Sequence, residues 1–446
     1  MVINDGYRAK NSELSDTGIP FARAGNIDGG FHFEDADRVP THTLAKVGLK
    51  RSLPGDVVFT SKGTVGRFAF VREETPEFVY SPQLCYWRSG DVSRIHPRWL
   101  FYWMNGREFL LQFKSVAGQT DMADYVSLRD QRAMKITLPP LPEQKAIAAV
   151  LGALDDKIEL NRRMNATLEA MAQALFQSWF IDFDPVRRNA DRDRNQPSPQ
   201  PAGHPSPPGR RDGDEGLVEY DKLFPDSFQE SELGPMPKSW EVCKFKDITS
   251  KIGSGATPRG GSEVYVDEGT ALIRSQNVYD HEFHWEGLAR LTDKSAVELK
   301  SVEVRRNDVL INITGDSILR TCVVDPSVLP ARVNQHVAII RAIEGIPPRY
   351  LHLYLAQQSM KSILIGMSAG ATRHAITKGH LESIDVVKPS APVLAAFETI
   401  TTPWFDQIDA NRTQSRTLAT LRDTLLPKLL SGELCVDTFH PESQRK

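Results

Sequence analysis

The chain has 446 residues, a formal net charge of -3, 40% hydrophobic residues and 25% charged residues, which exceeds one ordinary hydrophobic core and predicts two or more domains. No apolar run reaches the roughly 18 residues of a membrane span, which argues against a membrane protein. The four cysteines lie far apart, so neither a zinc ribbon nor a disulfide framework is indicated, and a reducing cytoplasm fits best.

The chain opens with a globular block at 1–141. The run DVVFT (56–60) predicts a β-strand, and PRWLFYWMNGREFLLQF predicts an aromatic amphipathic helix. Only MVINDGYRAKN precedes the part of this block that the second half of the chain repeats. Either the block lacks an opening strand, or the true start of the protein lies upstream of Met1.

A long helix is expected at 142–182, after the prolines of LPPLPEQ. Residues 183–234 are dense in proline, glycine and charge, so we expect a flexible linker there, because such a composition buries too little apolar surface to order itself. A second globular block follows at 235–391. A second long helix is predicted at 392–434, and a C-terminal tail occupies 435–446.

The second half of the chain repeats the first. PFARAGNI, which ends at Ile27, aligns with ALIRSQNV, which ends 251 positions later at Val278. Asp56 in LPGDVVFT aligns with Asp308 in RRNDVLIN, so DVLINI (308–313) is a second predicted strand, and PRYLHLYLAQQSMKSIL is a second amphipathic helix. The shared order and spacing of these matches indicate an internal repeat.

The two long helices carry apolar residues at the alternating four- and three-residue spacing of a coiled-coil seam. Arg422 interrupts the pattern, and we expect Leu421 to replace it, while Pro427 should bend or end the second helix. Asn161 and Asn411 are equivalent, and a buried seam asparagine commonly fixes register. The predicted seam comprises Leu151, Leu154, Ile158, Asn161, Leu168, Leu175, Trp404, Ile408, Asn411, Leu418 and Leu425.

These elements predict an α+β fold of two repeated small α/β domains separated by a pair of long antiparallel helices with pseudo-twofold symmetry. The length of the helices suits a stiff spacer between the blocks. The alternative is that both helices belong to the core of one larger α/β protein. The expected linker argues against it, because one compact core would not need a linker.

The sequence shows no catalytic equipment. It has no GxxxxGK[ST] phosphate loop, no GxSxG elbow and no HExxH motif. His281 and His284 could ligate a metal, but a third ligand is not apparent, and exposed loop histidines are the simpler interpretation. Asp280, Glu298 and Lys300 weakly suggest a nuclease site, and a solvated charged edge explains them better. We therefore expect no metal and no cofactor on this chain.

Equivalent positions of the two blocks are rich in side chains that contact nucleic acid. Arginine suits guanine, and asparagine or glutamine suits adenine, while glycine-containing loops after strands let backbone N–H groups approach phosphates. The alternative is that the amide side chains form turns and the arginines are surface charges. The predicted DNA-binding residues are Arg23, Asn26, Lys62, Thr64, Arg67, Gln83, Gln119 and Thr120 in the first block, and Arg274, Asn277, Thr314, Arg320, Asn334, Gln335, Thr372, Arg373 and His374 in the second.

The passage LPPLPEQKAIAAVLGALDDKIELNRRMNATLEAMAQALFQSWFIDFDPV resembles the first conserved helical region of the specificity (S) subunit of type I restriction–modification systems. LRDTLLPKLLSGEL resembles the second such region. Trp240, GSGATPRGG, IRSQNV and the AGATR segment resemble the edges of its target recognition domains. The resemblance covers essentially the whole chain.

This resemblance implies two target recognition domains, each reading one half of a bipartite, asymmetric site in double-stranded DNA. The paired helices would act as a ruler and dock two methyltransferase (M) subunits, which carry S-adenosylmethionine and methylate adenine, and a motor-nuclease (R) subunit would join for cleavage. The chain itself would not be an enzyme. Two alternatives stay open: a self-sufficient methyltransferase or nuclease with an unrecognised site, and a coiled-coil scaffold without a DNA role.

Overall fold

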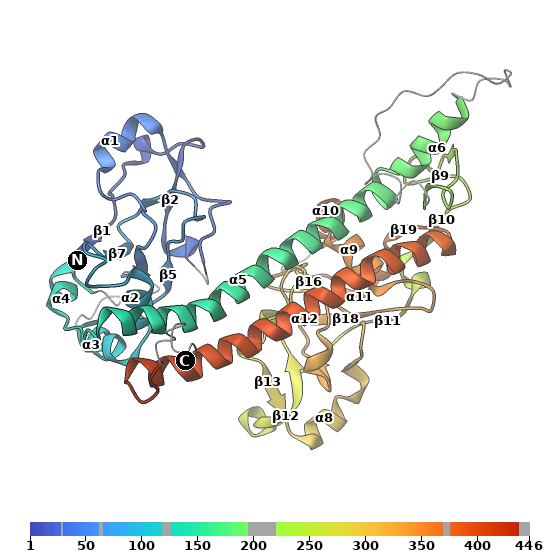
Figure 1. Cartoon of the computed structure of the whole chain (residues 1–446). Coiled ribbons are helices and arrows are strands. Elements are labelled where there is room, and N and C mark those ends of the chain that lie inside the picture. The colour runs from blue at the N-terminus through green and yellow to red at the C-terminus, as the bar shows by residue number, and fades with distance from the viewer. Residues whose placement is uncertain (28–29, 62–65, 118–125, 195–219, 369–374, 437–446) are drawn as a thin grey trace, which may run out of the picture. The chain divides into compact units, whose positions relative to one another are not determined.

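The computed structural model describes residues 1–27, 30–61, 66–117, 126–194, 220–368 and 375–436. The chain divides into two compact units, Met1–Arg162 with Asn411–Lys446 (unit 1) and Arg163–Ala410 (unit 2). Each unit contains one globular block and a segment of each long helix (Figure 1). Within the described ranges, no helix is both long and apolar enough to cross a membrane.

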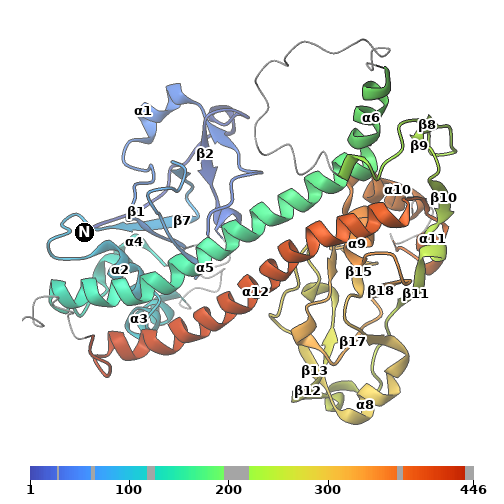
Figure 2. The ribbon, with the colours of Figure 1, turned by 45° about the vertical axis from the view of Figure 1, so that its right-hand side comes forward.

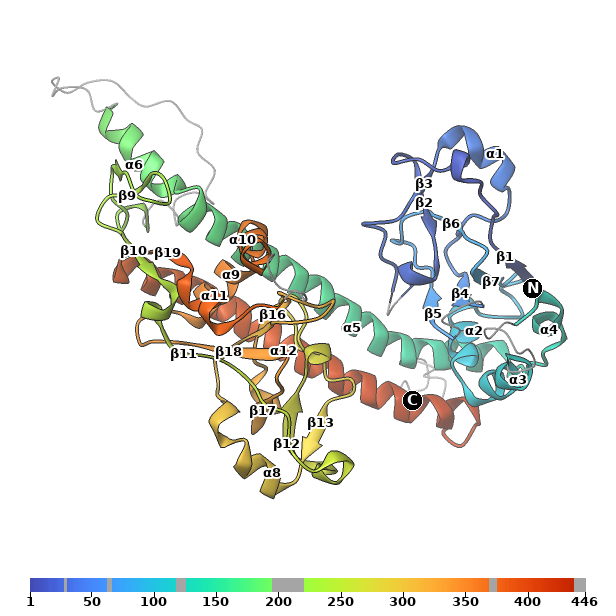
Figure 3. The same ribbon diagram turned by 180° about the vertical axis from the view of Figure 1, so that it is seen from behind.

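The block of unit 1 contains two small sheets (Figure 3). The first is antiparallel, with the order β1 (Val2–Asp5), β7 (Leu84–Arg88), β4 (Val57–Thr60) and β5 (Phe68–Phe70). The second has the order β3 (Arg38–Val39), β2 (Ile19–Ala22) and β6 (Val79–Tyr80), with β2 and β6 parallel. Strand β1 is the opening strand whose presence the sequence leaves open.

Unit 2 repeats this arrangement (Figure 2). One sheet has the order β11 (Thr249–Ser254), β18 (Val337–Ala342), β15 (Val309–Asn312) and β16 (Thr321–Val323). The other has the order β13 (Ala289–Leu291), β12 (Tyr265–Ile273), β17 (Ala331–Val333) and β14 (Glu303–Val304), with β12 and β17 parallel. Strands β4 and β15 confirm the strands predicted at 56–60 and 308–313. Two further hairpin-like pairs belong to unit 2: β10 (Glu241–Lys244) with β19 (Asp385–Lys388), and β8 (Phe228–Gln229) with β9 (Met236–Pro237).

A buried ion pair stands at the same place in the main sheet of each unit. Asp56 is fully buried and accepts hydrogen bonds from Nε and Nη2 of Arg88 at 2.6 and 2.7 Å. Asp308 is also fully buried and accepts from the same two atoms of Arg341, both at 2.7 Å. The repeat is therefore structural as well as sequential, down to individual side chains.

Each predicted amphipathic helix is in fact two helices. They are α2 (Pro97–Met104) and α3 (Arg107–Ala117) in unit 1, and α9 (Pro348–Ala356) and α10 (Gln358–Ser368) in unit 2. In unit 1 the break falls at Gly106, where an added Cβ would come within 2.4 Å of Cδ1 of Leu430. The break thus makes room for the end of the C-terminal helix. Shorter helices complete the blocks: α1 (Leu44–Val47), α4 (Leu128–Ala133), α8 (Asp293–Glu298) and α11 (Lys378–Ser383).

The two long helices are α5 (Leu141–Phe176), which continues as a π-helical turn (Gln177–Ile181), and α12 (Ala391–Leu430). Within unit 1 their segments run antiparallel, since Asp155 bonds Arg422 at 2.8 Å while Asn161 bonds Ser415 at 3.2 Å. Within unit 2 the later part of α5 packs on the earlier part of α12. All eleven predicted seam residues are buried or half-buried.

Two expectations about α12 were wrong. Leu421 does not enter the seam, because it is 44% exposed. Arg422 takes the inward position instead, where Asp155 accepts its hydrogen bond and also accepts one from the hydroxyl of Tyr102 at 2.6 Å. A charged residue can occupy the seam here because its partner lies opposite. Pro427 does not end the helix, which continues to Leu430.

The expected linker at 183–234 is structured at both described ends, because it contains apolar residues among its charges. Helix α6 spans Asp184–Arg194. Phe183 and Val186 are buried in the core of unit 2 together with Phe224. The buried carboxylate of Asp221 accepts hydrogen bonds from Arg188 at 2.9 and 2.7 Å. Residues 195–219 lie outside the described part of the chain.

Candidate nucleic-acid interface

In unit 1, the predicted residues Arg23 and Gln83 meet at one edge of the second sheet. Arg23 follows β2 and Gln83 follows β6, and the carboxyl ends of parallel strands meet at the same edge. Gln83 Oε1 accepts a hydrogen bond from the backbone N–H of Ala24 at 3.1 Å, which joins the two loops. Both side chains are exposed. This edge therefore presents a cation beside an amide.

Unit 2 builds the same edge with different neighbours. Arg274 follows β12, and Gln335 follows β17, with which β12 is parallel. The exposed side chain of Gln335 accepts a hydrogen bond from Oγ1 of Thr257 at 2.5 Å. Thr257 belongs to GSGATPRGG, a motif that the sequence analysis used only for the family resemblance. Its position after β11 is the signal that could have identified it as a site residue.

The predicted asparagines Asn26 and Asn277 hold the loops that carry the arginines. In each, Oδ1 accepts a hydrogen bond from the backbone N–H of the arginine three residues earlier, at 2.8 and 3.0 Å. Nδ2 of each donates to a backbone carbonyl further along, at 2.9 Å in both. Asn277 is fully buried. These amides are used within the chain, so the turn-forming interpretation applies to them. Asn334 is similar, since its Oδ1 accepts from the N–H of His336 at 3.1 Å.

The four described arginines of the prediction differ in freedom. Arg23 pairs with Asp37 at 2.6 Å, and its side chain remains 48% exposed. Arg274 is half-buried, and its Nη2 donates to a backbone carbonyl at 2.5 Å. The guanidinium of Arg320 lies 4.5 Å from the ring centroid of Tyr279. Arg67 is half-buried. Because a guanidinium has five N–H donors, these contacts orient each side chain and leave donors for a ligand.

Thr314 brings a further loop of unit 2 to the same edge. Its Oγ1 lies 2.7 Å from Nδ1 of His336, and its backbone forms a β-bridge with Ala375. The remaining predicted residues, Lys62, Thr64, Gln119, Thr120, Thr372, Arg373 and His374, lie outside the described residues. Among the residues that are described, no group of three or more His, Cys, Asp or Glu side chains is placed to hold a metal ion.

The two edges share a backbone frame and differ in their exposed side chains. Exposed donors and acceptors on loops are the groups that read base edges and grip phosphates. A twice-repeated α/β block with such an edge on each copy, joined to paired helices, defines a modular recognition protein with two related but unlike binding surfaces.

Comparison with known proteins gives this class its family. A profile described as "Type I restriction modification DNA specificity domain" matches residues 3–170. The HindI specificity subunit of Haemophilus influenzae is 25% identical over 87% of this chain and 88% of its own length. The MjaIX specificity subunit of Methanocaldococcus jannaschii is 24% identical over 86% and 78%. The chain belongs to the family of type I restriction–modification specificity subunits, as its motifs predict.

A solved structure supports the fold. The crystal structure of a type I restriction–modification S subunit from M. genitalium matches with a TM-score of 0.51 and 13% identity, over 96% of this chain and 93% of that one. At this identity the match concerns the fold alone. It agrees with the predicted fold of two α/β domains and a pair of long helices.

Proposed function

We propose that this chain, as the DNA specificity subunit of a type I restriction–modification complex, reads a two-part asymmetric DNA site with one half-site for each unit. The observation that carries the proposal is the duplicated edge, which places Arg23 with Gln83 and Arg274 with Gln335 after equivalent parallel strands. Unlike neighbours, such as Thr257 in unit 2, favour unlike half-sites.

In this proposal each edge combines direct base reading with phosphate contacts. An arginine that donates two hydrogen bonds to guanine and a glutamine that bonds adenine each contribute about 1–3 kcal/mol of discrimination against the wrong base. The asparagines of the turns act indirectly, since they hold the arginine loops in place. The small net charge of the chain is consistent with partner subunits that supply much of the phosphate contact.

The catalytic step is assigned to partners. Methyltransferase subunits would bind S-adenosylmethionine and methylate adenine in each half-site, and a motor-nuclease subunit would join for cleavage. The paired helices α5 and α12 would set the number of base pairs between the half-sites. Support for these assignments comes from the family, whose relatives are named as specificity subunits of type I restriction enzymes.

The test is to form the complex with its methyltransferase subunit and sequence the adenines that it methylates. Arg23→Ala should weaken discrimination at one half-site by about 1–3 kcal/mol, and Arg274→Ala should do so at the other. Arg94→Ala, at an exposed arginine outside the edge, is the control and should change neither.

Three outcomes would contradict the proposal. Equal loss at all sequences would mean that the arginine contacts phosphate rather than a base. Methyl transfer by the purified chain alone would show that it is an enzyme itself. A footprint without two separate protected clusters would favour a scaffold role.

A further inference from the structure

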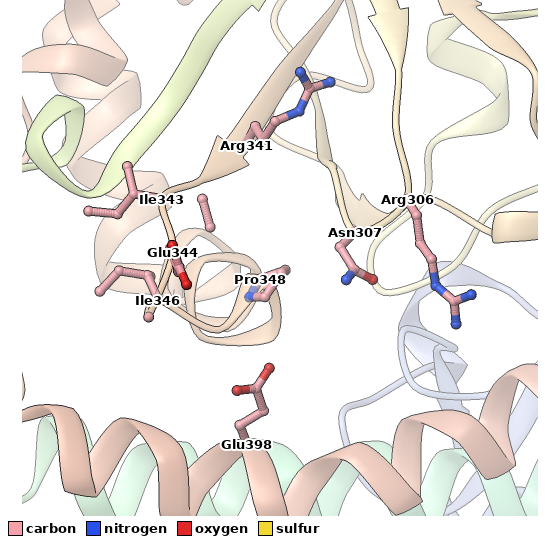
Figure 4. A pocket seen from close by; sticks show the side chains of 10 residues that line it. Arg306, Asn307, Arg341, Ile343, Glu344, Ile346, Pro348 and Glu398 are labelled. Carbon is pink, nitrogen blue, oxygen red and sulfur yellow. The ribbon is translucent and has the colours of Figure 1, made fainter.

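A groove lies between the block of unit 2 and helix α12, away from the candidate nucleic-acid interface. Two adjoining cavities of about 290 and 180 Å³ form it, and Arg306, Asn307, Pro348 and Glu398 line both. Figure 4 shows Glu398 pointing from α12 into the larger cavity, opposite Asn307. Residues 306–307 precede β15, whereas the candidate interface follows β15, so the two sites lie at opposite ends of one sheet.

The equivalent place in unit 1 is closed by the chain itself. Asp156 on α5 accepts hydrogen bonds from both terminal nitrogens of Arg98, at 2.8 and 2.7 Å, and also pairs with Arg72. Arg98 can lie along the helix because residue 152 is glycine, where an added Cβ would come within 2.8 Å of the guanidinium carbon. The hydrogen bonds from Arg98 lower the pKa of Asp156 to about 2.

Unit 2 lacks this closure, for a steric reason. The repeat aligns Thr402 with Gly152, so a side chain occupies the path that Arg98 takes in unit 1. Arg349, the counterpart of Arg98, instead lies 4.1 Å from the ring centroid of Phe405 and 3.6 Å from Asp409. It is therefore directed to the next turn of α12.

Asp406, the counterpart of Asp156, is consequently left without a cation. Asp406 and Glu398 are both exposed, and neither has an ion-pair partner within the described part of the chain. The second arginine of unit 1, Arg72, aligns with Asp325, so the repeat replaces a cation by an acid there. The groove thus has two acids in the place where unit 1 holds two arginines.

We infer that this groove is a docking site for an arginine or lysine side chain of a partner polypeptide, which completes in unit 2 the contact that Arg98 and Arg72 make in unit 1. The inference rests on the proposed function, because the partner tested is the methyltransferase subunit. A nucleic acid does not fit this groove, since Glu398 and Asp406 repel phosphates. A cationic side chain fits because both acids are accessible and the cavity between them is open.

The test measures the dissociation constant of the full chain and its methyltransferase subunit by titration calorimetry. The double variant Glu398→Gln/Asp406→Asn should weaken association by about tenfold or more, as expected when charged partners across an interface are neutralised. The double variant Asp267→Asn/Glu268→Gln removes the same charge from exposed positions on β12 and should leave it unchanged.

A second variant keeps both acids and closes the groove from within. Thr402→Gly should let Arg349 lie along α12 and pair with Asp406, so it should also weaken association. Unchanged association in the Glu398→Gln/Asp406→Asn variant would overturn the inference while the proposed function stands. An equal loss in the Asp267→Asn/Glu268→Gln control would overturn it too. Failure of the unsubstituted pair to associate would overturn both proposals.

Discussion

Replacing Asp56 by asparagine should loosen the main sheet of unit 1 and leave unit 2 intact. The buried Asp56 carboxylate accepts four hydrogen bonds, from the N–H of Leu53, the hydroxyl of Tyr80 and two nitrogens of Arg88. Asparagine keeps the shape but removes the charge, and its amide nitrogen would face other donors. The Arg88 side chain is 15% exposed, so its charge is left largely uncompensated.

The magnitude follows from this burial. Removing one partner of a buried ion pair costs about 3–5 kcal/mol, and the lower end applies because Arg88 reaches the surface. A loss of about 3 kcal/mol makes backbone amides that open with the sheet exchange roughly 150-fold faster.

Hydrogen–deuterium exchange read by mass spectrometry resolves the two units. The amides of β4 and β7 should exchange faster in Asp56→Asn, while those of β15 and β18 keep their rates. Asp308→Asn should give the reverse pattern. Asp91→Asn is the control, because this exposed carboxylate bonds Ser93 within its own turn. If Asp56→Asn accelerated β4 and β7 no more than Asp91→Asn does, or both units equally, the reasoning would be refuted.

Two further changes test the fold. Gly255→Ala should destabilise unit 2 by about 3 kcal/mol, because the new Cβ would lie 2.0 Å from the carbonyl oxygen of Val333; Gly253→Ala in the same strand meets open space and should cost much less in urea unfolding. Burial lowers the pKa of His96, whose Nδ1 accepts from the N–H of Trp99 at the start of α2. The folded state then binds the proton less readily than the unfolded one, so this stabilisation is present above about pH 6.5 and is lost as the pH falls. His96→Asn keeps an acceptor and should reduce the loss of unit 1 stability between about pH 7 and pH 5; an unchanged pH profile would contradict this role.

The periodic features of the fold could be predicted from the sequence, whereas features that depend on a partner far along the chain could not. The repeat, the strands β4 and β15 and the long helices follow from local patterns. By contrast, Arg422 enters the seam because Asp155 lies opposite, 267 positions away in sequence. Heptad spacing alone favours Leu421, since it counts apolar residues and does not include the acid across the helix pair.

The candidate site shows the same division. Residue type makes Asn277 as suitable for adenine as Gln335, yet Asn277 is fully buried and Gln335 is exposed. The difference arises because Asn277 lies inside a turn that its own amide closes, while Gln335 stands at a strand end. Alignment of the repeats locates both loops, but burial decides which side chain faces a ligand.

The division of the chain into units has a consequence for its synthesis. Unit 1 includes the last part of α12, and Leu429 is buried in its core beside Leu151 of α5. Residues 163–410, the whole of unit 2, leave the ribosome before that segment does. At about 5–20 residues per second, the nascent first block waits roughly 12–50 seconds for the helix that covers it. The half that is translated first is therefore completed last, and its apolar helix face is the part of the newborn protein most in need of a chaperone.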